Sequence, residues 1–212
     1  MGKKPKTLQT LVCEALNTLT LHLSVNPFSV TLNVVPPGDE KAPLVQQVVR
    51  FDADTGRIIV PGNQVKNVFP DYSEKDAYAE HTKQFKIGAL AGIPLFYQNN
   101  PLVKPLLDNH RVQEYSFWSW MTTGYCGFVQ ELHTLGEKET MRHANKVLNN
   151  VHNSQDFGTI GLDYATQLML RFGPKALREV MGYSTTTEIH DLVKPREFLS
   201  RQYMRKQNKP SK

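Results

Sequence analysis

Hydrophobic positions recur with two different periods in the first third of the chain. A helical period predicts a short helix over residues 8–16. The period then changes to two, which predicts a pair of strands over residues 19–25 and 30–34. A second alternating pair follows over residues 45–51 and 57–60, and the Asp and Gly residues between them supply turn chemistry. This part of the chain is therefore expected to form antiparallel hairpins with one buried face.

The rest of the chain has a helical period. The first long run of this kind is expected to end where residues 88–94 introduce glycines and a proline. Thr134 and Glu137 match a capping box, which predicts a helix from Glu137 to Val151. Another helix is predicted over residues 162–172, before a Gly-Pro pair.

The segment from Arg111 to His133 organises this helical part. It holds both tryptophans, and residues 115–130 carry no charge. Large side chains occur on most sides of the helical wheel, so the segment is expected to be a buried central helix. A membrane span is not expected, because a span needs about 20 apolar residues and this window is shorter and rich in hydroxyl groups.

These patterns predict an α+β protein with amino-terminal hairpins followed by a larger helical region around a buried central helix. Length and the small amount of core that hairpins can bury predict one domain. The expected organisation is a basic arm over residues 1–6, a domain over 7–193 and a basic tail over 194–212. Within the domain, residues 7–70 form the hairpin layer and 71–193 the helical layer.

Charge is concentrated at the two ends of the chain. The whole chain carries +5, with +3 in residues 1–6 and +6 in residues 194–212, so the body between them carries −4. Polybasic ends commonly meet phosphates, although they can also serve only to keep a protein in solution. An aromatic side chain among the basic ones suits stacking on bases. The predicted nucleic-acid-binding residues are Lys3, Lys4, Lys6, Lys194, Arg196, Arg201, Tyr203, Arg205, Lys206 and Lys209.

Candidate chemistry is sparse. Glu139 and His143 lie one helical turn apart, but no established metal-ligand spacing accompanies them, so they are interpreted as surface hydrogen-bonding groups. Cys126 lies in the most apolar window, where a thiol becomes less reactive. Phosphate-loop and dinucleotide fingerprints do not occur in the sequence. No catalytic residue, metal site or cofactor is therefore predicted.

Cysteine content and the start of the chain bear on location. Only Cys13 and Cys126 occur, and both are expected to be reduced, buried thiols. No apolar run of the signal-peptide type follows the first basic residues. An intracellular, cytoplasmic location is expected.

Residues 51–66, FDADTGRIIVPGNQVK, carry a local resemblance. They resemble a stretch of the RNA-binding backbone subunits of CRISPR effector complexes, in which a D-x-x-T-G turn and a strand lead to I-P-G-S-x-I-K and a helix. The resemblance implies an RNA-binding subunit of an assembly. The rest of the chain departs from that family, because a long helical region replaces its further strands and glycine-rich loop.

Residues 176–193 resemble a helix-turn-helix, with a turn at Gly182 and a second capping box. They also look like the end of tyrosine recombinases, but Tyr183 stands in the place of that family's histidine, so its catalysis is not implied. Glu188 and Asp191 would be repelled by a DNA groove, and a plain helical corner is the preferred interpretation.

The function expected from the sequence is a non-enzymatic, nucleic-acid-associated assembly subunit of the coat, nucleocapsid or ribonucleoprotein type. RNA is preferred to DNA, and copies of the chain or other subunits are possible partners. The alternatives are the CRISPR-type subunit, a helix-turn-helix DNA-binding protein, and an enzyme or small-ligand binder with an aromatic pocket near Trp118, Trp120 and Tyr125.

Overall fold

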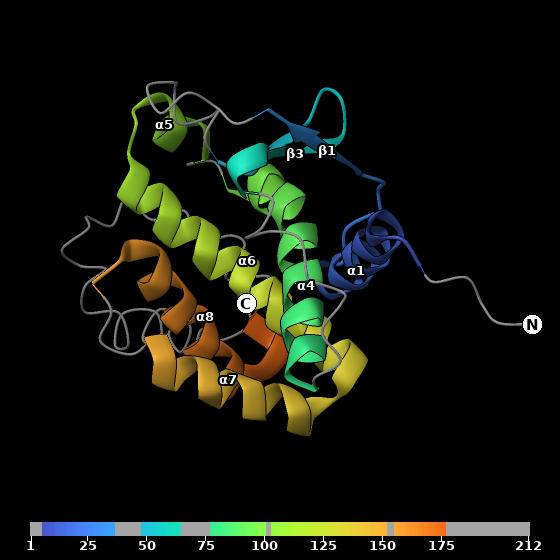
Figure 1. The fold of residues 1–212 in the computed structure, drawn as a ribbon, viewed down its shortest axis with the longest axis vertical. Helices are drawn as coiled ribbons and strands as arrows, with labels where there is room; N and C mark the ends of the chain where they lie inside the picture. Colours follow the sequence, from blue (N-terminus) through green and yellow to red (C-terminus); the bar gives the residue numbers. More distant parts are fainter. Residues whose placement is uncertain (1–5, 37–47, 65–76, 101–102, 152–154, 177–212) are drawn as a thin grey trace, which may run out of the picture.

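A computed structural model describes most of the chain (Figure 1). It has a small three-stranded sheet near the amino terminus and a larger helical body, which confirms the predicted α+β class. The described residues are 6–36, 48–64, 77–100, 103–151 and 155–176. The predicted helix-turn-helix beyond residue 176 and all of the basic tail lie outside them.

The first helix, α1 (Leu8–Leu23), is longer than the sequence pattern predicts. Thr7 caps its first turn by accepting a hydrogen bond from the Thr10 amide, and Ser24 ends it in the left-handed conformation. The predicted strand over residues 19–25 is therefore wrong. Leu19 and Leu23 are buried, but Leu21 is 79% exposed, because the core selects the helical spacing and leaves the alternating leucine outside.

The sheet consists of one predicted antiparallel hairpin and a third strand that pairs in parallel with it. β2 (Arg50–Asp52) pairs antiparallel with β3 (Arg57–Pro61), and β1 (Thr31–Val35) pairs parallel with the other edge of β3. The order is β1-β3-β2, so Ile58 and Val60 lie in the central strand and are fully buried. Since α1 is a helix, β1 has no hairpin partner before it.

Side-chain hydrogen bonds stabilise this sheet at the edge strand β1 and at the turn between β2 and β3. The Gln9 amide group of α1 bonds to Val30 and accepts from the Leu32 amide at 2.8 Å, so the helix caps the free edge of β1. At the turn between β2 and β3, the Asp52 carboxylate accepts hydrogen bonds from Asp54 and Thr55. The bond from the Thr55 hydroxyl is the main reason that the pKa of Asp52 is lowered.

After a short 3₁₀ turn, η1 (Gly62–Gln64), the long helix α4 (Ala77–Asn99) packs on the central helix. It passes through the predicted break and contains Pro94. Its glycines serve packing, since a Cβ added at Gly88 would lie 2.5 Å from the Gln130 Cβ and 2.7 Å from the Cys126 carbonyl oxygen. The prediction of a break at 88–94 is wrong, because close helix approach outweighs the helix-breaking tendency of glycine.

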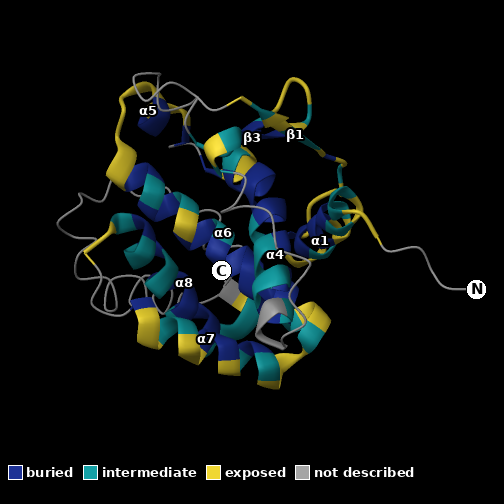
Figure 2. Cartoon of the chain, viewed as in Figure 1, coloured by how far each residue is buried: buried dark blue, intermediate teal, exposed yellow. Residues whose placement is uncertain are grey.

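The predicted central helix is confirmed as α6 (Val112–Leu135), which follows the short α5 (Val103–Asp108). Most of α6 is buried between α4 on one side and α8 on the other (Figure 2). Trp118 and Tyr125 are core residues, whereas Trp120 is 52% exposed. The Tyr115 hydroxyl bonds to the Tyr97 hydroxyl and to the Val49 carbonyl, which ties α6 to α4 and to the start of β2.

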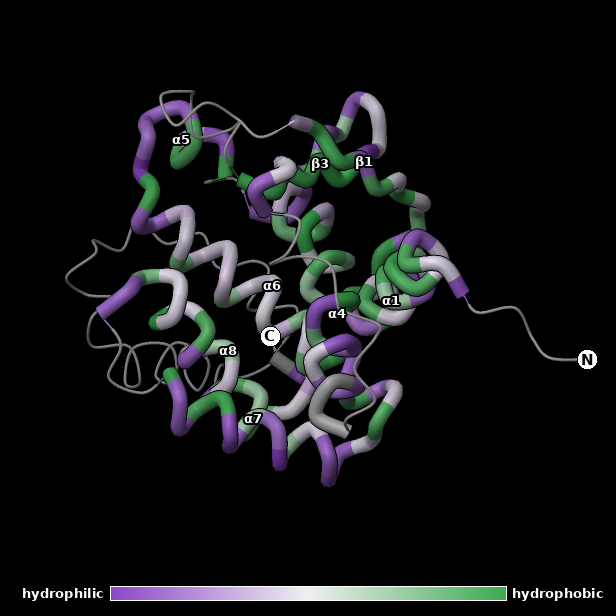
Figure 3. The backbone as a smooth tube through the Cα atoms, viewed as in Figure 1, coloured by the Kyte–Doolittle hydropathy of each residue, from purple (hydrophilic) through white to green (hydrophobic). Residues whose placement is uncertain are grey.

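Two further helices complete the described body. α7 (Glu137–Val151) has the predicted bounds, and α8 (Phe157–Phe172) is followed by a 3₁₀ turn, η2 (Gly173–Ala176). The trace of α7 is coloured mostly hydrophilic along its outer side (Figure 3). The predicted cap is wrong, because Thr134 belongs to α6 and donates its hydroxyl to Gln130.

A single residue, Gly136, separates α6 from α7. Its φ of +84° is a conformation that L side chains rarely adopt, so glycine permits the sharp corner. The corner places residues shortly before and after it close together. Among the helices of the described part of the chain, none is both long enough and apolar enough to cross a membrane.

Candidate metal centre

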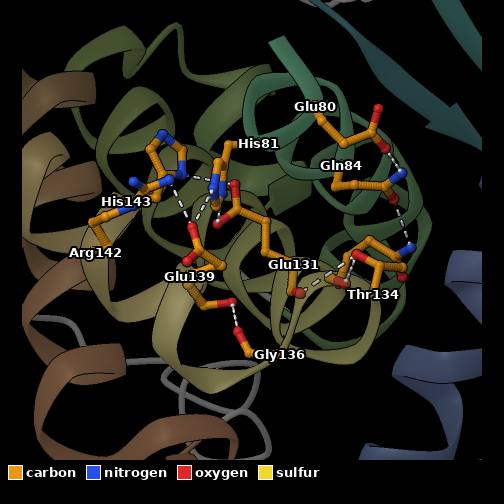
Figure 4. Close-up of polar contacts among 11 residues, drawn as sticks. Glu80, His81, Gln84, Glu131, Thr134, Gly136, Glu139, Arg142 and His143 are labelled. Atoms are coloured by element: carbon orange, nitrogen blue, oxygen red, sulfur yellow. Dashed lines mark hydrogen bonds and ion pairs between the residues drawn. The ribbon is translucent and has the colours of Figure 1, made fainter. Parts of the chain in front are cut away.

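Three buried polar side chains meet at the corner between α6 and α7. His81 comes from α4, Glu131 from α6 and His143 from α7 (Figure 4). Glu131 is 0% exposed, His81 6% and His143 7%. Charged residues are rarely buried this deeply unless they are paired or bind a metal.

The distances define one compact group. The His143 Nδ1 atom lies 2.7 Å from Oε1 of Glu131, which is hydrogen-bonding distance. The His81 Nδ1 atom lies 3.8 Å from Oε2 of the same carboxylate, which is too long for a hydrogen bond. One potential ligand atom from each of the three residues lies within 4.8 Å of the other two. Both histidines thus approach Glu131, each near a different carboxylate oxygen.

Two atoms of this group have no hydrogen-bond partner, although they are buried. They are Nδ1 of His81 and Oε2 of Glu131. Leaving a buried polar atom unsatisfied costs about 1–3 kcal/mol, and more when the group is charged. These two atoms lie 3.8 Å apart, and a cation bound between them would satisfy both.

Burial is the main electrostatic influence on Glu131. It raises the pKa of this carboxyl, while the hydrogen bond from His143 and the charges of His143 and His81 act in the opposite direction. The ionised carboxylate is therefore disfavoured by its surroundings in the absence of a bound cation. A divalent cation would supply the missing positive charge.

Two phenylalanine rings lie close to His143. Its ring centroid lies 6.0 Å from those of Phe85 and Phe128, and 5.2 Å from that of His81. A low-dielectric wall strengthens any charge interaction at the cluster. A separate chain of hydrogen bonds from Gln130 through Gln84 to Glu80 links α6 and α4 beside it (Figure 4).

On the solvent side, Glu139 and Arg142 of α7 border the cluster. Oε2 of Glu139 lies 3.4 Å from Nε2 of His81 and 2.6 Å from the Arg142 guanidinium group. Side-chain exposure rises from Glu131 at 0% through Glu139 at 38% to Arg142 at 66%. The group therefore extends from the core to the surface.

Most residues predicted from the sequence to bind nucleic acid fall outside the described part of the chain. Lys6 is the one within it, and its ammonium group pairs with the Glu14 carboxylate at 2.6 Å. The aromatic residues proposed to line a ligand pocket are divided, since Trp118 and Tyr125 belong to the packed core and Trp120 lies at the surface near Gly158. The pocket therefore gains no support from the buried pair.

The cluster corrects the interpretation of His143 as a surface residue. In the sequence, Glu131 lies before Gly136 and Glu139 and His143 lie after it, but only the last pair has the spacing of one helical turn. His81 lies fifty positions before Glu131. Only the packing of α4 against α6 brings it to the corner.

Comparison of the chain with models of protein families, with curated proteins and with solved structures finds no match. The function is therefore inferred from the chemistry of the cluster.

Proposed function

We propose that the protein binds a divalent transition metal of the zinc class through His81, Glu131 and His143. The observation that carries this proposal is the pair of buried, unsatisfied atoms, Nδ1 of His81 and Oε2 of Glu131, beside a third ligand residue. A metal between the three side chains would satisfy both atoms and neutralise the buried carboxylate. It would also cross-link α4, α6 and α7.

The donor set favours this class of metal. Two imidazoles and one carboxylate suit zinc, whose sites with three protein ligands keep a fourth position for water or another small ligand. The same set can also hold ferrous iron. Calcium and magnesium prefer oxygen ligands and are not expected here. Binding would replace the hydrogen bond between His143 and Glu131, because each ligand must present a lone pair to the metal.

The direct test is metal titration of the full-length protein after removal of metals with a chelator. Zinc binding is followed by calorimetry, and cobalt serves as a spectroscopic probe through its visible absorption. We expect one metal ion per chain, with affinity reduced more than about 100-fold in each of His81→Gln, Glu131→Gln and His143→Gln, since even residues behind the ligands contribute 10–100-fold.

Matched controls exist on the same two helices. His133 of α6 and Glu137 of α7 are exposed, so His133→Gln and Glu137→Gln should bind zinc as the wild type does. Circular dichroism of each variant establishes that it is folded. Wild-type protein that binds no metal, or Glu131→Gln protein that binds it equally well, would contradict the proposal.

A second function, nucleic-acid association, rests on a different observation, the separation of charge in the sequence. A body carrying −4 lies between ends carrying +3 and +6, which suits a cytoplasmic assembly subunit that contacts phosphates through its ends. RNA is the preferred partner, and copies of the chain or other subunits would contact the body. This function is compatible with a metal in the helical corner.

The test uses single-stranded RNA and duplex DNA over a series of salt concentrations. The variant Arg201→Gln/Arg205→Gln/Lys206→Gln should bind RNA more weakly, and its logarithmic salt dependence should be shallower by about 2, at about 0.7 per lost phosphate contact. The control Lys138→Gln/Lys146→Gln/Lys175→Gln removes the same charge from the helical body. Equal weakening by both variants would show only a general charge effect.

A further inference from the structure

The two nitrogens of the His81 ring face different carboxylates. Nδ1 lies 3.8 Å from Oε2 of Glu131, within the group of potential ligands, whereas Nε2 lies 3.4 Å from Oε2 of Glu139. Glu139 is not part of the group whose ligand atoms lie within 4.8 Å of one another. It contacts the other ring nitrogen of His81 and lies outside that group (Figure 4).

Such a carboxylate has a defined effect on a metal-binding histidine. When one ring nitrogen donates its N–H to a carboxylate, the other nitrogen presents its lone pair to the metal, and the ring becomes a better donor. Arg142 pairs with the same oxygen of Glu139, with 2.6 Å between the guanidinium nitrogen and Oε2 of Glu139. Arg142, Glu139 and His81 thus form a chain that leads from the surface to the proposed metal.

From this geometry we propose that Glu139, held by Arg142, is the positioning residue of the metal site. It accepts the Nε2–H of His81, selects that tautomer and directs Nδ1 toward the metal. The inference rests on the proposed function for its effect on affinity. The contact can be tested separately from metal binding, since Nε2 of His81 and Oε2 of Glu139 lie 3.4 Å apart.

Three substitutions separate the contributions. Glu139→Ala removes the acceptor and should lower zinc affinity 10–100-fold. Glu139→Gln keeps an amide oxygen that can accept the same N–H, so its loss should be smaller, about 10-fold at most, and Arg142→Gln should lie in the same range. Glu137→Gln is the control, an exposed carboxylate two positions earlier on α7.

The second readout is the tautomer of His81, read from long-range proton–nitrogen NMR spectra of full-length protein with and without zinc. Wild-type protein should show Nε2–H in both states, with the Nδ1 resonance moving when zinc is added. Glu139→Ala should show a mixture of tautomers in the metal-free state, and Glu139→Gln should largely restore Nε2–H.

The outcomes distinguish the two proposals. Wild-type protein that binds no zinc contradicts the metal site, while its His81 tautomer still tests the contact with Glu139. Unchanged affinity and tautomer in Glu139→Ala would overturn the positioning role and leave the metal site standing. Zinc bound through Nε2 of His81, with binding abolished by Glu139→Ala, would also overturn it, because Glu139 would then be a ligand.

Discussion

Helix α6 makes two different kinds of contact with its neighbours, one through closely packed glycines and one through buried polar side chains. Along its middle it meets α4 and α8 through glycines, and a Cβ added at Gly161 of α8 would lie 2.3 Å from the Phe117 carbonyl oxygen. At its carboxyl-terminal end it presents Glu131 to two histidines. We call the first contact the glycine seam (Gly88, Gly92, Gly124, Gly127 and Gly161) and the second the polar corner (His81, Glu131 and His143).

The two contacts differ in what satisfies them. The glycine seam is complete, because backbone and side-chain atoms already fill the space and any addition must displace them. The polar corner is incomplete, because it buries a carboxylate and leaves two polar atoms unsatisfied. Added volume at the glycine seam should therefore lower the free energy of unfolding, and cations should have no effect there. A cation bound at the polar corner should instead raise the free energy of unfolding.

The largest effect is expected from metal at the polar corner. Free zinc at about 1,000 times its dissociation constant should raise the free energy of unfolding by about 4 kcal/mol, since the unfolded chain lacks the assembled site. Urea unfolding with zinc and with chelator measures the difference. The increase should persist in His133→Gln and vanish in His143→Gln; an equal increase in both would place the metal elsewhere.

Added volume at the glycine seam should come next. Gly161→Ala should lower the free energy of unfolding by about 3 kcal/mol, because its Cβ would meet the backbone of α6 and the two helices must separate. Gly158→Ala in the same helix is the matched control, since its Cβ would lie 3.2 Å from the half-exposed Trp120 ring, which can move. Denaturant unfolding should separate the two variants clearly, and equal losses would mean that the close contact is not the cause.

A smaller effect is expected from removing the charge at the polar corner. In metal-free protein, Glu131→Gln should be as stable as the wild type or up to about 1 kcal/mol more stable, because the amide can still bond to His143 without a buried charge. Glu131→Ala should lose about 2 kcal/mol, since it leaves the histidines unsatisfied. A loss of several kcal/mol in Glu131→Gln would show that the carboxylate stabilises the corner without a metal.

The smallest effect concerns the alkylation rates of the two thiols, which are measured under native conditions. Burial raises the pKa of Cys126, which lies in the glycine seam, so little of it is thiolate at pH 8 and it should resist alkylation. Cys13, expected from the sequence to be buried, is only partly buried and should react. Mass spectrometry after timed labelling measures both rates, and labelling of Cys126 should accelerate in Gly161→Ala. Rapid labelling of Cys126 in native wild-type protein would contradict the tight packing of the seam.

Where local pattern and tertiary packing agree, the sequence predicted the structure well. The uncharged window around Trp118 is the core of α6, and α7 has its predicted ends. The hairpin of β2 and β3 was also expected, because Asp52, Thr55 and Gly56 form its turn with their own side chains and backbone. In each case the interactions that determine the element lie within the element.

The predictions from sequence were wrong where packing against another element determined the local structure. The residues of 19–25 fit both a strand and a helix, and the core selected the helix by burying Leu16, Leu19 and Leu23. The glycines of α4 signal a break in isolation, but against α6 they permit contact.

The same distinction applies to the proposed metal site. The sequence predicted only that Glu139 and His143 lie one turn apart on the same helix. Only the tertiary structure brings His81 from a distant helix and buries Glu131, and that burial is the basis on which a cation is proposed there. Local chemistry determined α7 and the β2–β3 hairpin, whereas packing determined the extent of α1 and α4 and the proposed site, because burial depends on residues that are distant in sequence.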